Sequence, residues 1–230
     1  MAEDPHDDTS DAPPGRGVPA ADIARVVAAH GRLDAIVAGL DDDEARSASR
    51  LPGWSIGHLL THVARNADSH LWRTEGAIAG EVVDQYPGGA DQRAGAIDAG
   101  ADRPADVLVG DVRSSSAAVD SAWAEVPTAA WGNPTRDLSG RSRPLSELPG
   151  RRWLEVEIHL IDIGRPGDPT HRDWSDDFVA VWLPHQRAGL EARLPAGASA
   201  PQPGSIDPRD ELAWLVGRLD RPDLPVLGPW

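Results

Sequence analysis

The chain has 230 residues, and its 22 basic residues, all of them arginine, are outnumbered by 37 acidic ones, which gives a formal net charge of −15. This balance argues against binding to nucleic acid or to anionic membrane surfaces, because both require basic patches. The sequence contains no cysteine, which excludes disulfides, cysteine-ligated zinc and a protein thiol nucleophile. No apolar run approaches the length of a membrane span and the N-terminus lacks an apolar signal segment, so we expect a cytoplasmic protein.

Residues 1–19 are rich in Asp, Pro and Gly and poor in bulky apolar side chains, a composition that predicts a disordered tail. The rest of the chain has apolar residues at helical spacing and no convincing strand alternation. We therefore predict an all-α fold. Its helices should cover Ala20–Leu40, Ile56–Ala79, Asp91–Ala99, Pro104–Glu125, Arg151–Gly164, Trp174–Leu194 and Arg209–Leu219.

Several residues should mark where these helices begin, bend or end. Ser55 is a good N-cap for the helix that starts at Ile56, and Ser146 with Glu147 should cap the helix after them. Pro184 should kink or split its helix, because proline removes a backbone donor. Turn residues occur throughout 127–144, which predicts a long irregular connection.

The segment Arg151–Gly164, RRWLEVEIHLIDIG, is apolar on most sides when it is drawn as a helix, which is typical of a buried helix. Glu155, His159 and Asp162 nevertheless share one narrow face, since they are spaced i, i+4 and i+7. Charged groups are rarely buried unless they are paired or bind a metal. This face is therefore a candidate half of a metal site; the alternatives are a Glu–His pair or a polar stripe facing solvent.

A second histidine pair lies in the helix predicted for Ile56–Ala79. His58 and His62 are spaced i, i+4, and Asn66 follows one turn later. Two histidines at this spacing are a recognised metal-binding geometry, but the spacing alone is a weak signal, because a histidine beside an apolar stripe is usually structural.

Four sequence runs together resemble the mycothiol-dependent maleylpyruvate isomerase family of the DinB-like metal-binding superfamily. They are LPGWSIGHLLTHVARNAD (51–68), YPGGADQRAGAIDAGADRP (86–104), LPGRRWLEVEIHLIDIG (148–164) and DELAWLVGRLDRPDLP (210–225). The resemblance implies a DinB-like up-and-down four-helix bundle over 20–165. A short, reduced C-terminal region over 166–230, with a terminal W-L-x-G-R helix, should follow this bundle.

The resemblance also implies a divalent metal, usually zinc, held by one histidine of the second helix and a Glu-x-x-x-His pair of the fourth. Those positions are His62, Glu155 and His159 here. We expect His58 and Asp162 to lie behind these ligands, with Asp162 orienting one of them.

The sequence departs from the family pattern near its C-terminus. Family members usually carry strands between the bundle and the terminal helix, whereas here only about Pro195–Asp207 stands in that interval. The family places an arginine of the terminal helix near the active site, and that residue is Arg218 in this chain. Because the segment before the terminal helix is so short, the sequence does not specify whether Arg218 reaches the metal.

Three protein ligands leave a zinc ion with an open position, which is the arrangement of a catalytic site. Because the chain has no cysteine, the nucleophile would be an external thiol, which the resemblance identifies as mycothiol. Its thiolate would add to the cis double bond of maleylpyruvate and leave after rotation, giving fumarylpyruvate. Arg218 and Arg93 would hold substrate carboxylates, and Asn66 and Asp68 are candidates for contacts with the thiol.

Two other functions remain open at this stage. A mycothiol S-transferase would use the same thiolate but leave it attached to an electrophile, and a non-catalytic metal-binding module would act through protein contacts. Consumption of the thiol separates the isomerase from the transferase. The expected partners are a small-molecule substrate and a low-molecular-weight thiol, without nucleic acid or membrane, and the sequence does not specify an oligomeric state.

Overall fold

The structure, a computed structural model, describes residues 17–228. Most of the tail predicted for residues 1–19 therefore lies outside the described residues. The helices and strands, in chain order, are α1 (Ala20–Val37), α2 (Asp42–Arg46), α3 (Ile56–Ala79), α4 (Gly89–Gly100), α5 (Ala105–Glu125), β1 (Pro134–Arg136), β2 (Ser142–Pro144), α6 (Leu148–Asp162), α7 (Asp176–Ala188) and α8 (Pro208–Leu215), with short 3₁₀ turns between some of them.

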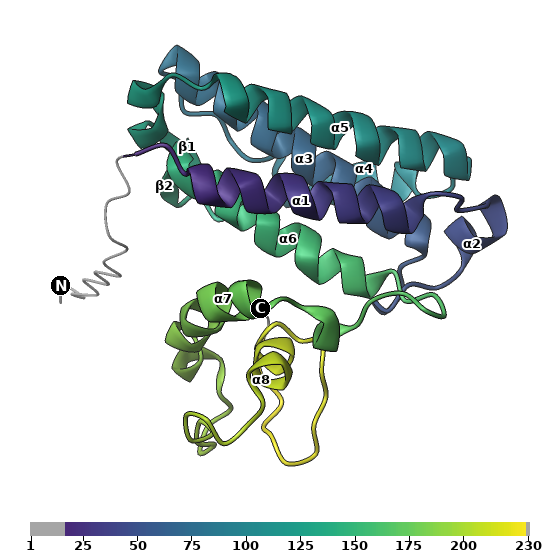
Figure 1. Cartoon of the computed structure of the whole chain (residues 1–230), viewed down its shortest axis with the longest axis vertical. Helices are drawn as coiled ribbons and strands as arrows, with labels where there is room; N and C mark the ends of the chain where they lie inside the picture. Colours follow the sequence, from purple (N-terminus) through teal and green to yellow (C-terminus); the bar gives the residue numbers. More distant parts are fainter. Residues whose placement is uncertain (1–16, 229–230) are drawn as a thin grey trace, which may run out of the picture.

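Four long helices, α1, α3, α5 and α6, lie side by side and form a bundle (Figure 1). Helix α3 packs mainly against α5, and α1 packs mainly against α6. Their apolar faces enclose one continuous core, which confirms the predicted all-α bundle. Within residues 17–228, no helix combines the length and apolar character needed to cross a bilayer.

Helix α3 carries half of the candidate site, and it begins and ends at the predicted residues. The Ser55 hydroxyl accepts a hydrogen bond from the His58 backbone N–H (3.2 Å), and the His58 ring reaches back to Ser55. Such reciprocal bonds satisfy backbone donors that have no partner inside the helix. Gly57 allows α3 to pack closely against the connection between α4 and α5, because a Cβ atom at this position would lie 2.1 Å from the Ala101 carbonyl oxygen.

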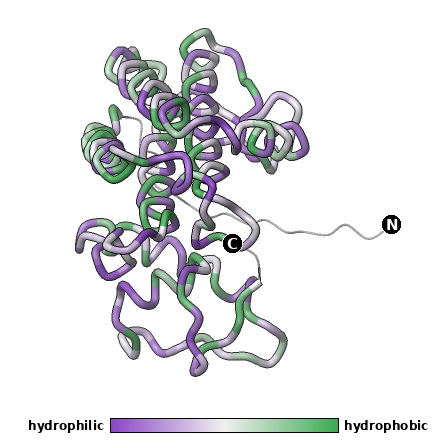
Figure 2. The backbone as a smooth tube through the Cα atoms, turned by 90° about the vertical axis from the view of Figure 1, so that its right-hand side faces the viewer, coloured by the Kyte–Doolittle hydropathy of each residue, from purple (hydrophilic) through white to green (hydrophobic). Residues whose placement is uncertain are grey.

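The C-terminal region packs against α6. In Figures 1 and 2 it lies below the bundle, and much of it is irregular chain. Trp174 and Phe178 belong to the same apolar core as the bundle helices, and the Trp174 indole N–H donates to the Glu157 carbonyl oxygen (3.1 Å). Contact with α6 thus holds this region against the helix that carries Glu155 and His159.

The connection predicted over 127–144 contains a small β-hairpin. Strands β1 and β2 pair antiparallel, with Thr135 opposite Arg143. Each strand has three residues, too few to show the apolar–polar alternation by which strands are recognised. The turn between them uses a left-handed glycine, Gly140, with φ of +83°.

Several helix boundaries differ from the predicted ones, most of them by one to three residues. Helix α6 begins at Leu148, and Glu147 makes no side-chain capping bond, because its carboxylate accepts from Arg143 and Arg151 instead. Helix α7 continues past Pro184 to Ala188 and stops before the predicted end.

Helix α8 ends four residues early, at Leu215. The reason is Gly217, whose φ of +68° reverses the chain and lets the Arg218 backbone N–H donate to the Ala213 carbonyl oxygen (2.7 Å). Left-handed backbone of this kind is readily adopted by glycine. The turn sends the Arg218 side chain toward the end of α6.

Candidate metal centre

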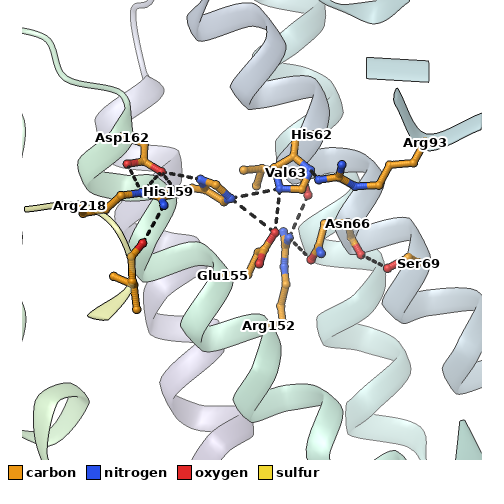
Figure 3. A network of polar contacts seen from close by, with 11 residues as sticks. His62, Val63, Asn66, Ser69, Arg93, Arg152, Glu155, His159, Asp162 and Arg218 are labelled. Carbon is orange, nitrogen blue, oxygen red and sulfur yellow. Dashed lines mark hydrogen bonds and ion pairs between the residues drawn. The ribbon is translucent and has the colours of Figure 1, made fainter. Parts of the chain in front are cut away.

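Three side chains from two helices meet inside the bundle (Figure 3). His62 comes from α3, and Glu155 and His159 come from α6 one turn apart. His62 Nε2 lies 2.7 Å from Glu155 Oε1 and 3.1 Å from His159 Nε2, and the His159 Nε2–Glu155 Oε1 distance is 3.4 Å. Both imidazoles are buried, whereas the Glu155 side chain keeps 22 % of its surface, so the cluster is open on the side of the carboxylate.

These three atoms are arranged as a metal site requires. Donors about 2.0–2.1 Å from a tetrahedral zinc ion lie about 3.3 Å from one another, and the three observed separations bracket that value. The donor set of two imidazoles and one carboxylate is also one that zinc accepts at catalytic sites. Among the described residues, this is the cluster whose ligand atoms could hold a metal ion. The three side chains therefore fit the divalent metal that the sequence predicted for them.

The protonation states follow from burial and from contacts within the cluster. Burial lowers the pKa of His62 to about 4, although its hydrogen bond to Glu155 opposes this, so the ring is neutral near pH 7. Burial would raise the pKa of Glu155, but hydrogen bonds from His159 and His62 outweigh it and hold the pKa well below the ordinary value. The cluster therefore presents a carboxylate and a neutral imidazole, the forms that ligate metals.

His159 is oriented from behind by a carboxylate. Its Nδ1 donates to Asp162 Oδ2 (2.8 Å), which leaves Nε2 pointing toward His62 and Glu155. Burial lowers the pKa of His159, but the bonds to Asp162 and Glu155 outweigh it and raise the pKa above the ordinary value. A carboxylate behind a ligating histidine is the usual arrangement in metal sites.

Arg218 lies behind Asp162. Its Nε is 2.9 Å from Asp162 Oδ1 and its Nη2 is 2.9 Å from Oδ2, and Nη1 donates to the Val216 carbonyl oxygen. The C-terminal region thus reaches the cluster through a chain of contacts from Arg218 to Asp162 to His159 (Figure 3). The Arg218 guanidinium is engaged by this carboxylate, which supports a positioning role in addition to the substrate contact that the resemblance implied.

Arg93 approaches the cluster from α4. Its Nη2 lies 3.0 Å from His62 Nδ1, and its guanidinium lies 5.7 Å from the centre of the Tyr86 ring. A guanidinium only donates hydrogen bonds, so Nδ1 accepts and the neutral His62 ring carries its proton on Nε2, facing Glu155. The Tyr86 hydroxyl is buried and has no hydrogen-bond partner in the described part of the chain.

The remaining sequence candidates lie around the cluster. His58 caps α3 and stacks beside Trp54, and the Trp54 ring contacts His62 edge-on with centroids 5.5 Å apart. The Asn66 side-chain oxygen, Oδ1, accepts from Arg152 (2.9 Å), and Asp68 pairs with Arg65 (3.1 Å). Within residues 17–228, neither Asn66 nor Asp68 makes a hydrogen bond or an ion pair with the three candidate ligands.

Sequence analysis missed Arg152, which is fully buried. It lies at i−3 from Glu155 and i−7 from His159, so the spacing that identified the metal face includes it as well. Helical spacing alone does not distinguish a buried arginine at this position from an exposed one.

The family model described as "Mycothiol maleylpyruvate isomerase N-terminal domain" matches residues 26–164. Two solved structures resemble the chain with a TM-score of 0.79 and 22 % sequence identity; the match covers 92 % of this chain and 97 % of each of theirs. They are crystal structures of the mycothiol-dependent maleylpyruvate isomerase and of a histidine-to-alanine mutant of it. No curated protein matches the chain. The matched segment contains His62, Glu155 and His159, and the chain belongs to the mycothiol maleylpyruvate isomerase N-terminal domain family.

Proposed function

We propose that this chain is a metal-dependent isomerase that uses mycothiol to convert maleylpyruvate, or a closely related cis-dicarboxylate, into its trans isomer. The observation that carries the proposal is the convergence of His62, Glu155 and His159, whose ligand atoms all lie within 4.8 Å of one another. Membership of the family supplies the class of thiol and substrate.

His62, Glu155 and His159 would hold a divalent metal, which we propose to be zinc. When bound, such an ion supplies a positive charge that stabilises a thiol as its thiolate near neutral pH. The chain has no cysteine, so the thiol must come from the cosubstrate.

In the proposed reaction the sulfur of mycothiol adds to the activated double bond, and the electron pair moves onto the conjugated carbonyl group. The former double bond is then a single bond and rotates. Expulsion of the thiolate restores the double bond in the trans geometry, so thiol is neither consumed nor oxidised. The chain's own residues bind and orient the two reactants, since the sequence offers no protein thiol to attack the substrate.

Arg93 is the residue that we assign to a substrate carboxylate. A metal ion on Nε2 of His62 requires the ring proton to be on Nδ1, and an Nδ1–H group cannot accept the hydrogen bond from Arg93. The guanidinium must then turn to another acceptor, and arginine pairs with carboxylates through two parallel bonds. The buried Tyr86 hydroxyl, beneath Arg93, is a second candidate donor to the ligand.

Arg218 and Asp162 hold His159 in the orientation that directs Nε2 into the cluster. Because the Arg218–Asp162 contact comes from the C-terminal region, that region contributes to the proposed centre. We keep Asn66 and Asp68 as candidates for the polar part of mycothiol, since both are on α3 within two turns of His62.

The test follows substrate and free thiol together in a mixture of zinc-loaded protein, mycothiol and maleylpyruvate. We expect loss of the cis substrate at constant thiol. Falling thiol would instead indicate an S-transferase, and no change in either would leave a metal-binding module.

The variant His62→Ala should lose both zinc and activity. His70→Ala provides the matched control, because His70 is equally buried on the same helix but is not part of the cluster. Full zinc stoichiometry in His62→Ala would overturn the assigned ligand set.

A further inference from the structure

Arg152 is completely buried in the middle of the bundle, one helical turn before Glu155. Its guanidinium reaches α3 through Nη1, which donates to the Val63 carbonyl oxygen and to Asn66 Oδ1, both at 2.9 Å. Val63 and Asn66 are the residues one and four positions after His62. Arg152 thus connects the part of α6 that carries Glu155 with the part of α3 that carries His62 (Figure 3).

The same guanidinium also reaches the two other bundle helices. Its Nε donates to His30 Nε2 on α1 (3.1 Å), and its Nη2 lies 3.5 Å from Ser116 Oγ on α5. His30 must therefore be neutral with its proton on Nδ1, which lies 2.9 Å from Asp120 Oδ1 on α5. One side chain consequently makes polar contacts with α1, α3 and α5 from its position on α6.

The buried charge of Arg152 is costly unless all of its hydrogen bonds are satisfied. Burial lowers the pKa of Arg152 to about 10, opposed most by the charge of Glu155, so the guanidinium remains protonated at neutral pH. Among residues 17–228, no carboxylate oxygen lies within ion-pair distance of Arg152, whose hydrogen bonds go to neutral acceptors. A buried charge is costly unless its hydrogen bonds are satisfied, so the acceptors on the neighbouring helices fix where the guanidinium lies.

We propose that Arg152 is the positioning residue of the metal centre: it fixes the separation of His62 from Glu155 by binding α3 to α6 one layer below them, while His30 and Asp120 hold its guanidinium from the opposite side. This inference rests on the metal centre proposed above. It assigns to Arg152 no contact with the metal, the thiol or the substrate.

Arg73 provides a matched control for a merely structural role. It is also a buried arginine on a bundle helix, with a pKa lowered to about 10 by burial. Its hydrogen bonds, however, go to the backbone and side chain of Ser69 in its own helix. Removal of Arg73 therefore removes a buried charge without cutting a connection between α3 and α6.

The experiment measures zinc affinity of the full chain by competition with a chromophoric chelator, together with unfolding by denaturant. We expect Arg152→Met to bind zinc about 10–100-fold more weakly than wild type, the loss seen when groups that support metal ligands are removed. Arg152→Lys should lose nearly as much, since lysine keeps the charge but cannot reach acceptors on three helices at once. Arg73→Met should stay within about twofold of wild type.

Three results would overturn the inference. They are wild-type zinc affinity in a folded Arg152→Met protein, an equal loss in Arg73→Met, and full rescue by Arg152→Lys, which would show that charge alone matters. If Arg152→Met does not fold, Asn66→Ala decides, because it removes one acceptor on α3 and leaves the cation in place; unchanged zinc affinity would then count against the inference. A wild-type chain that binds no zinc would instead overturn the proposed metal centre itself.

Discussion

Replacement of Asp162 by Asn tests whether the C-terminal region tunes the metal centre. Asp162 is 1 % exposed and accepts from His159 Nδ1 (2.8 Å) and from the Arg218 guanidinium (2.9 Å). Asparagine has the same shape but only one acceptor atom. If its oxygen takes the Oδ2 position, it still accepts from His159 Nδ1 and from Arg218 Nη2, but its NH₂ group replaces Oδ1 and faces the Arg218 Nε donor. If it is reversed, the His159 N–H has no acceptor. Either orientation loses at least one of the hydrogen bonds that Asp162 accepts.

The expected losses follow from these contacts. Removing a carboxylate behind a metal-binding histidine lowers metal affinity by about 10–100-fold, which corresponds to about 1.4–2.7 kcal/mol. Breaking a buried ion pair costs about 3–5 kcal/mol of folding stability. Because the Arg218 side chain keeps 17 % of its surface and can be partly hydrated, we expect a value for Asp162→Asn near the lower end, about 3 kcal/mol.

Zinc competition measures the first loss, and denaturant unfolding of the metal-free protein measures the second. Asp168→Asn is the matched control, since Asp168 pairs with Arg165 just beyond α6 and its side chain is only 9 % exposed. The control should lose stability but retain zinc affinity. Zinc affinity of Asp162→Asn within about twofold of wild type, or an equal loss in the control, would refute the chain of contacts from Arg218 to His159.

Other consequences can be measured independently. Arg93→Met should raise the KM for the dicarboxylate by about 10–100-fold, the value of a charged hydrogen bond, and should not weaken zinc binding; a zinc loss like that of His62→Ala would contradict this. In metal-free protein the raised pKa of His159 should contribute stability that is complete below about pH 6.5 and is lost as the pH rises through the folded-state pKa. Denaturant unfolding between pH 5 and 9 should show this, and Asp162→Asn should reduce the effect, because Glu155 remains beside His159. Gly217→Ala should cost about 1–2 kcal/mol, because alanine is strained at φ +68°, and unchanged stability would contradict the role given to this turn.

Local spacing predicted the part of the site that lies on a single helix. Glu155, His159 and Asp162 share one face because the helical period places them there, and the structure shows the expected contact between His159 and Asp162. The third ligand, on α3, could not be predicted from periodicity, because helical spacing does not distinguish His58 from His62. The family resemblance made that choice, and the structure places His62 in the cluster while His58 caps the helix.

Contacts between helices were beyond the reach of sequence periodicity. The contact between the Asn66 side-chain oxygen and Arg152 was not predicted, because the register of α3 against α6 decides which polar groups of the two helices meet. That register depends on the packing of side chains from all four helices. A helical period specifies which face a residue occupies but not the height at which a neighbouring helix meets it.

The C-terminal region contributes a single side chain, that of Arg218, to the contacts behind the candidate site. From α6 to α8 the chain is largely irregular, and its contribution to the candidate metal centre is the Arg218 guanidinium, which lies against Asp162. Two local features achieve this: the Trp174 contact holds the region on α6, and the left-handed turn at Gly217 reverses the chain. The intervening segment can therefore differ in length or structure without loss of the contact, provided that it still returns Gly217 to the end of α6. A short connection is sufficient for Arg218 to act on His159 through Asp162.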